Sequence, residues 1–135
     1  MITFRDDFRP SLDAARELYR ATTLATRRPV DDDARFAAML ANANLVVTAW
    51  DGERLVGIAR SLSDFAWTTW LADLAVRTSH QHRGIGRELV RRTQAAAPQA
   101  KLVLLAAPAA TRYYPRIGFT HAPQAWLLHE DERVR

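Results

Sequence analysis

The chain has 135 residues, of which 48% are hydrophobic and 25% are charged, and its formal net charge is +4. This length predicts a single domain over residues 1–135, and the lack of cysteine excludes disulfide bonds and thiolate metal sites. No run approaches the roughly 18 apolar residues of a membrane span, and the chain opens with acids and Pro10 rather than an apolar signal core, so we expect a cytoplasmic protein.

Along the chain, apolar residues alternate between the period of helices and that of strands. This alternation, with neither repeats nor a linker, is typical of α/β proteins. The first predicted elements are a strand over residues 2–8, a helix capped by Ser11 and a helix capped by Asp32 or Asp33. Two strands follow, over 45–50 and 54–62, joined by an Asp51-Gly52 hairpin turn. The rest of the chain is predicted to form a strand over 67–76, a helix that Pro98 ends, a buried strand over 101–107, a short helix near 110–118 and a strand near 125–130.

The segment 79–90, SHQHRGIGRELV, joins the strand over 67–76 to the helix after it. A strand, helix and strand in succession predict a right-handed crossover with parallel strands, and such sheets bind ligands outside the carboxyl ends of their strands. Backbone N–H groups at a helix start lack internal partners, and Gly84 and Gly86 leave out side chains that would keep an anion away. The turn therefore suits a phosphate group. The other interpretation is that both glycines only permit an awkward turn.

Two familiar phosphate loops do not match this spacing. A P-loop ends in Gly-Lys-Ser/Thr, but Gly86 is followed by Arg87 and Glu88. A dinucleotide-binding fingerprint needs a third glycine three positions after Gly86, where Leu89 stands. Neither motif is therefore present.

Gln81, Gly84 and Gly86 form the pattern Gln-x-x-Gly-x-Gly after an apolar strand that ends in DLAV. The pattern resembles the acetyl-CoA pyrophosphate loop of the GNAT acetyltransferase superfamily. A second match follows at residues 112–119, RYYPRIGF, which is similar to the family's aromatic-Tyr-x-x-x-Gly-Phe segment. The order of the elements follows the family as well, so the resemblance covers nearly the whole chain.

The resemblance implies the GNAT fold, a mixed α/β (α+β) architecture with a central mixed sheet of about six to seven strands and about four helices. It implies acetyl-CoA as co-substrate and no metal. The strand residues whose backbone matches the pantetheine partner are Leu74, Ala75 and Val76. The residues that match the pyrophosphate loop are Gln81, His82, Arg83, Gly84, Ile85, Gly86 and Arg87. The side chains of Arg83 and Arg87 either add charge near the phosphates or are solvated surface groups.

Tyr114, four residues before Gly118, matches the family's proton donor to the departing CoA thiolate. Charge builds on sulfur as an amine attacks the thioester, and a phenol with a pKa of about 10 is suited to donate the proton. The alternative is a core tyrosine with a satisfied hydroxyl.

Asp73 is the candidate for removing the amine proton through a water molecule. Many relatives carry Glu-Asp here, whereas this chain has Ala72-Asp73, so the glutamate that acts as a direct base is missing. The other interpretation is that Asp73 bonds a neighbouring backbone group. Ala107 stands where relatives often place an asparagine that bonds the pantetheine, and we expect its loss to weaken binding by only about 1 kcal/mol.

The other histidines and the tryptophans carry no clear motif. His80, His121 and His129 lack the spacing of metal ligands and are predicted to lie at the surface. The four tryptophans, Trp50, Trp67, Trp70 and Trp126, are predicted core residues.

The expected function is acetyl-CoA-dependent N-acetylation of a small-molecule primary amine, with Tyr114 as proton donor. The alternatives are a non-catalytic acyl-CoA-binding sensor domain and a peptide or protein N-acetyltransferase. The expected partner is a small-molecule amine acceptor. No membrane is expected, because no apolar run is long enough to span one. No nucleic acid is expected, because the arginines are scattered rather than placed on one stripe with stacking aromatics. A homodimer is left open.

Overall fold

A five-stranded mixed sheet forms the centre of the first of the two compact units, Met1–Leu105 and Ala106–Arg135, into which the chain divides. The structure is a computed structural model that describes residues 1–135. The strands are β1 (Ile2–Arg5), β2 (Leu45–Asp51), β3 (Arg54–Ser63), β4 (Thr68–Val76) and β5 (Lys101–Val103). The helices are α1 (Leu12–Arg20), α2 (Asp33–Asn42), α3 (Ile85–Ala96) and, in the second unit, α4 (Tyr113–Arg116). Short 3₁₀ turns cover Thr23–Arg27, Thr78–His80 and Pro108–Ala110.

The strands lie in the order β1-β2-β3-β4-β5, with antiparallel pairs up to β4 and a parallel β4–β5 pair. Helix α3 connects β4 with β5, so the predicted parallel crossover is confirmed. The predicted hairpin is also confirmed, because β2 and β3 pair on either side of Gly52, which takes the left-handed φ of +62°. The mixed α/β fold class is therefore the one predicted.

Both predicted helix caps at the N-terminal end of the chain are confirmed. The side chain of Ser11 accepts a hydrogen bond from the backbone N–H of Ala14 at the start of α1. Asp32 accepts one from the backbone N–H of Arg35 at the start of α2. Each bond satisfies a backbone donor that has no partner inside the helix. No helix has the length and apolar character that crossing a membrane requires.

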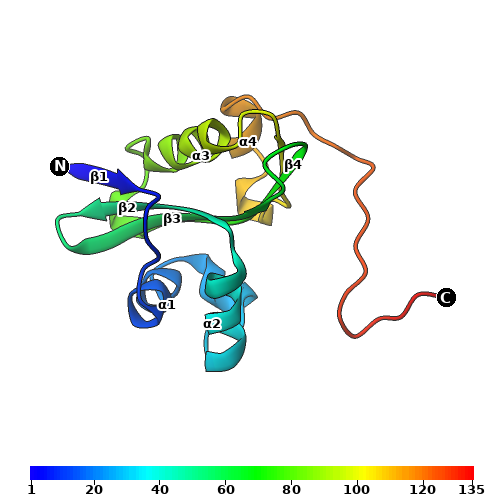
Figure 1. Ribbon diagram of the computed structural model, residues 1–135, viewed down its shortest axis with the longest axis horizontal. Coiled ribbons are helices and arrows are strands. Elements are labelled where there is room, and N and C mark those ends of the chain that lie inside the picture. Colours follow the sequence, from blue (N-terminus) through cyan, green and yellow to red (C-terminus); the bar gives the residue numbers. More distant parts are fainter. The chain divides into compact units, whose positions relative to one another are not determined.

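Helices α1 and α2 cover one face of the sheet and α3 covers the other (Figure 1). The core under α1 and α2 includes the fully buried side chains of Leu18, Phe36 and Ile58. On the opposite face, a Cβ atom added to Gly57 would lie 3.0 Å from Cδ1 of Leu89. The glycine therefore lets α3 lie close against β3.

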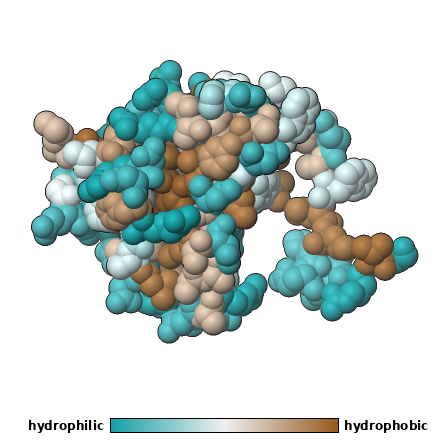
Figure 2. All heavy atoms as spheres, in the orientation of Figure 1, coloured by the Kyte–Doolittle hydropathy of each residue, from teal (hydrophilic) through white to brown (hydrophobic).

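The sheet has five strands rather than the six to seven expected, because one predicted strand is missing, and another is shorter than predicted. β5 ends at Val103 instead of continuing to residue 107, and its residues are exposed or half-buried rather than fully buried. Residues 125–130 form no strand, and Trp126 is 93% exposed. Apolar residues of this tail appear as brown spheres in Figure 2. An apolar run becomes a strand only where a neighbouring strand pairs with it.

Of the four tryptophans predicted to be core residues, none is fully buried, and only Trp50 packs against the core under α1 and α2. Trp50 and Trp70 are half-buried, whereas Trp67 is 72% exposed and carries the ammonium group of Lys101 at 4.6 Å from its ring centroid. Tryptophan is large and is seldom buried completely, so its sequence position alone is a weak guide to the core.

Candidate active site

Strand β4 has an open edge along its second half. Its parallel partner β5 pairs only with Thr68–Trp70 and then ends, whereas β3 pairs with β4 as far as Val76. The three predicted pantetheine-binding residues, Leu74, Ala75 and Val76, lie on this stretch. An unpaired strand edge presents a row of backbone N–H and C=O groups to which an extended ligand adds like a further strand.

The pairing of β3 with β4 is irregular just before the open stretch. Arg60 lies opposite Asp73 and Ser61 lies opposite Leu71, so the register skips Ala72. A bulge of this kind twists the strand and changes the direction of nearby side chains, and such bulges are frequent beside active sites. The irregularity places Ala72 and Asp73 at the start of the open edge.

The predicted pyrophosphate loop, residues 81–87, leads from the end of β4 into α3. Gln81, His82, Arg83 and Gly84 are exposed. The side-chain amide of Gln81 donates a hydrogen bond to the carbonyl oxygen of Val76 over 3.0 Å, which ties the loop to the open end of β4. The structure therefore brings the predicted pantetheine-binding stretch and the predicted pyrophosphate loop together in one unit.

Gly84 is the N-cap of α3 and has a left-handed φ of +80°. A Cβ atom built on this residue would meet no other atom within 4 Å, so the space at the start of the helix is open. His82 is also left-handed, with φ of +63°. The first N–H groups of α3 lack partners inside the helix, and the helix dipole favours negative charge there. The loop thus fits a phosphate group.

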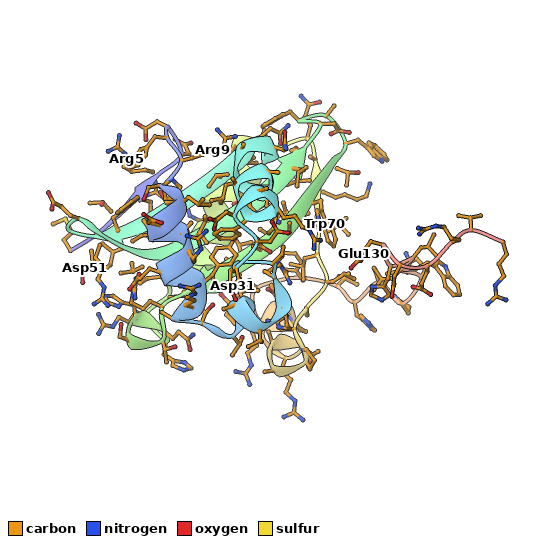
Figure 3. The ribbon with its side chains drawn as sticks, turned by 90° about the horizontal axis from the view of Figure 1, so that it is seen from below. Arg5, Arg9, Asp31, Asp51, Trp70 and Glu130 are labelled. Atoms are coloured by element: carbon orange, nitrogen blue, oxygen red, sulfur yellow. The ribbon has the colours of Figure 1, made fainter.

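His80, the residue before the loop, is buried, whereas the sequence predicted a surface position. Its Nε2 lies 2.9 Å from Oδ2 of Asp51 and its Nδ1 lies 2.7 Å from Oγ of Ser79. The hydrogen bond from His80 lowers the pKa of Asp51. Asp51 is the last residue of β2, at the β2–β3 hairpin, and is labelled in Figure 3. No local pattern predicts this contact, because its partners are 29 residues apart.

Asp73 is almost completely buried and accepts three side-chain hydrogen bonds. The hydroxyl group of Tyr19 and the Nε atoms of Arg28 and Arg60 each lie 2.6 Å from its carboxylate oxygens. Burial alone would raise the pKa of Asp73, but the charge and hydrogen bond of Arg60, with the bonds of its other partners, lower it overall. A carboxylate held in this way is a weak proton acceptor.

The partners of Asp73 were not identified from the sequence. Tyr19 lies on α1, Arg28 follows the 3₁₀ turn Thr23–Arg27, and Arg60 lies on β3. Burial, with the nearby charge of Asp73, raises the pKa of Tyr19, so its hydroxyl remains protonated. No motif marks these residues, because they come together only through the packing of α1 and the following loop on the sheet.

The second unit contains Tyr114, the predicted proton donor, within α4. The backbone N–H of Phe119 donates to the carbonyl oxygen of Tyr114 over 3.0 Å, and that of Gly118 donates to Pro115 over 3.2 Å. These two bonds form a Schellman motif, which requires the positive φ of +106° that Gly118 takes. The ring of Phe119 then lies edge-on to Tyr114, with 5.4 Å between ring centroids.

This turn explains the spacing of the Tyr-x-x-x-Gly-Phe segment. Glycine permits the left-handed residue after the helix, and the following Phe119 folds back over Tyr114. Tyr113 also lies edge-on to the ring of Tyr114, at 5.3 Å between centroids. No group of three or more His, Cys, Asp or Glu side chains in the structure is arranged to hold a metal ion.

Comparison with known proteins gives one family and many structures of the same fold. The family model described as acetyltransferase (GNAT) family matches residues 12–119, which include both motifs. A GNAT-family acetyltransferase of Streptococcus pneumoniae TIGR4 is 23% identical, with a TM-score of 0.73 over 96% of this chain and 100% of that one. A protein of Xanthomonas campestris pv. campestris, described as belonging to the GNAT family, is 25% identical, with a TM-score of 0.74 over 96% and 92%. An aminoglycoside N-acetyltransferase in complex with CoA is 16% identical, with a TM-score of 0.73 over 97% and 95%.

Proposed function

The chain belongs to the acetyltransferase (GNAT) family, and we propose that it transfers an acetyl group from acetyl-CoA to the primary amine of a small molecule. The observation that carries the proposal is the junction of the open β4 edge with the start of α3. Gln81 joins the two by its bond to Val76. An extended arm that ends in phosphates fits this junction, because one part needs backbone pairing and the other needs anion-binding N–H groups.

Two stretches of the first unit would hold acetyl-CoA. The backbone groups of Leu74, Ala75 and Val76 would pair with the amide groups of the pantetheine arm. The N–H groups of residues 81–87 would bind the pyrophosphate, and the exposed side chains of Arg83 and Arg87 add positive charge to the same surface. The complex of an aminoglycoside N-acetyltransferase of this fold with CoA supports the assignment.

Bound acetyl-CoA supplies a thioester whose carbonyl carbon accepts a nucleophile. The amine nitrogen of the acceptor forms the new C–N bond while the C–S bond breaks. Tyr114 donates its hydroxyl proton to the sulfur, because a phenol is a stronger acid than an alkyl alcohol and remains protonated at neutral pH. The proton lost by the amine passes to solvent, from which Tyr114 is protonated again.

Asp73, the other predicted catalytic residue, is proposed to position β4 rather than to remove the amine proton. Its three hydrogen bonds and lowered pKa make it a weak base, and its side chain is fully buried. The amine therefore reacts from its neutral fraction, which an environment of positive charge increases.

Two other functions would use the same CoA site. A non-catalytic acyl-CoA-binding sensor is favoured by the absence of a glutamate at Ala72 and by the bonded state of Asp73. A peptide or protein N-acetyltransferase would use the same loop with a larger acceptor. The three functions differ in whether an acceptor is acetylated and in which acceptor is used. CoA binding does not distinguish them, because all three bind CoA.

The test is release of free CoA thiol from acetyl-CoA in the presence of single amines. The panel contains polyamines, arylalkylamines, amino acids, aminoglycosides and short peptides. Amine-dependent release with a small molecule supports the proposal. Binding of acetyl-CoA without release for any amine would favour the sensor, and release with peptides alone would favour the protein acetyltransferase.

A further inference from the structure

The buried cluster around Asp73 carries an unbalanced positive charge. It contains two guanidinium groups, those of Arg28 and Arg60, and one carboxylate, while Tyr19 is neutral. The side chains of Asp73 and Arg60 are 0% and 9% exposed, but that of Arg28 is 26% exposed. The surplus charge of the cluster is therefore accessible to a ligand only through Arg28.

The guanidinium of Arg28 keeps two donors for a ligand. Its Nε bonds Asp73, its Nη2 donates to the carbonyl oxygen of Ala72 over 3.0 Å, and its Nη1 donates to that of Arg27 over 2.8 Å. A guanidinium has five N–H donors, so one N–H on each terminal nitrogen stays unused. Two donors on neighbouring nitrogens match the two oxygens of a carboxylate.

These donors lie beside Ala72 and Asp73, next to the end of the proposed pantetheine-binding stretch that is farther from the proposed pyrophosphate loop. Ala72 is the residue that the β3–β4 register skips, and the open stretch Leu74–Val76 follows directly. Arg28 lies in the segment between α1 and α2, in which Figure 3 labels Asp31, and its bonds to Asp73 and Ala72 hold this segment against β4. From the charge, the unused donors and this location we infer that the acceptor is an amine that also carries a carboxylate, which Arg28 binds.

The same segment offers no free carboxylate for an acceptor with several ammonium groups. Its acids already have partners: Asp31 pairs with Arg20, Asp32 accepts from the backbone N–H of Arg35, and Asp33 pairs with Arg16. A second ammonium group near Arg28 would be left unpaired beside a positive charge, which is unfavourable. This inference rests on the proposed acetyl transfer and narrows its acceptor class.

The test compares amines that differ only by the carboxylate on the carbon next to nitrogen. Suitable pairs are alanine with ethylamine, phenylalanine with phenethylamine, and lysine with cadaverine. For the pair with the highest turnover, we expect the wild type to favour the carboxylated member in kcat/KM. We expect Arg28→Gln to lower kcat/KM for that member by about 10- to 100-fold more than for the carboxylate-free amine, the usual effect of losing a charged hydrogen-bonded pair. A shift of β4 through the lost bonds to Asp73 and Ala72 would lower both members alike and leave their ratio unchanged.

Two variants serve as controls for this test. Arg27→Gln removes the same charge from the exposed neighbouring residue and should leave the preference intact. Arg28→Lys keeps a positive charge and should recover part of the preference for the carboxylated amine. This variant keeps the test decisive if Arg28→Gln folds poorly. An equal loss with both members of a pair, or a wild-type preference for the carboxylate-free amine, would overturn the inference while acetyl transfer stands. Acetyl-CoA binding with no acetylation of any amine would instead overturn the proposed function.

Discussion

Tyr19 donates its hydroxyl hydrogen bond to Oδ2 of Asp73 over 2.6 Å, and so joins helix α1 to strand β4 across 54 residues of sequence. Both side chains are buried. The same carboxylate also receives Arg28 and Arg60, which extends the connection to β3 and to the segment before α2. The position of the open β4 edge therefore depends on one buried carboxylate and its donors.

Replacement of Tyr19 by phenylalanine should destabilise the protein. The ring still packs against Phe36, but a buried carboxylate loses one donor, so we expect the free energy of unfolding to fall by about 1–3 kcal/mol. Urea unfolding of Tyr19→Phe, of Asp73→Asn and of the double variant measures this. In the Asp73→Asn background the cost of Tyr19→Phe should shrink, and equal costs in both backgrounds would show that the bond does not contribute.

The pH dependence of stability should carry the signature of Asp73. Its pKa in the folded protein is lowered, so its stabilising contribution is present above the unfolded value of about 3.9 and is lost as pH falls through the lower folded value. We expect the free energy of unfolding to fall below about pH 4 less steeply in Asp73→Asn than in the wild type. Asp13→Asn, at a carboxylate that is 96% exposed, is the matched control and should keep the wild-type slope. The same slope in Asp73→Asn would contradict the lowered pKa.

A carboxylate in the loop should prevent CoA binding. Gly84→Glu and Gly86→Glu each place a negative charge where the pyrophosphate is proposed to lie, so we expect calorimetry to detect no CoA binding. Gly52→Glu is a matched control for Gly84→Glu, because Gly52 also has a positive φ, of +62°, and open space around its Cβ position. Near-normal affinity in a folded Gly84→Glu or Gly86→Glu variant would remove the loop from the proposed site.

Loss of the Tyr114 hydroxyl should slow turnover without weakening acetyl-CoA binding. We expect Tyr114→Phe to lower kcat by about 10²- to 10⁴-fold, as is usual when general acid catalysis is lost. Tyr113→Phe removes the hydroxyl of the adjacent tyrosine and should have a much smaller effect. If kcat of Tyr114→Phe equals that of the wild type at saturating substrate, water or another group protonates the thiolate.

Local features of the fold could be predicted from the sequence. The caps at Ser11 and Asp32, the hairpin at Gly52 and the turn at Gly84 each depend on a few adjacent residues, and all four form as expected. The Gln81–Arg87 loop is likewise a continuous segment. Its position beside the β4 edge follows from chain connectivity, because only residues 77–80 separate the loop from the end of that strand.

Features that depend on distant partners could not be predicted. The donors to Asp73 come from positions 13, 45 and 54 residues away, and no local pattern marks Arg60, Arg28 or Tyr19 as its partners. The apolar runs at 104–107 and 125–130 have strand-like composition, but whether they become strands depends on pairing rather than on composition. His80 is buried for a similar reason, through a contact with the distant hairpin residue Asp51.

The most direct test is detection of the acetylated amine by mass spectrometry, with wild type, Gly84→Glu and Gly52→Glu incubated in parallel with acetyl-CoA and the most active amine of the panel. If acetyl-CoA is bound through the loop before α3, an acetylated product is expected with the wild type and Gly52→Glu, and none with Gly84→Glu. A wild type that binds acetyl-CoA yet acetylates no amine, or a folded Gly84→Glu variant that forms product as fast as the wild type, would contradict this expectation.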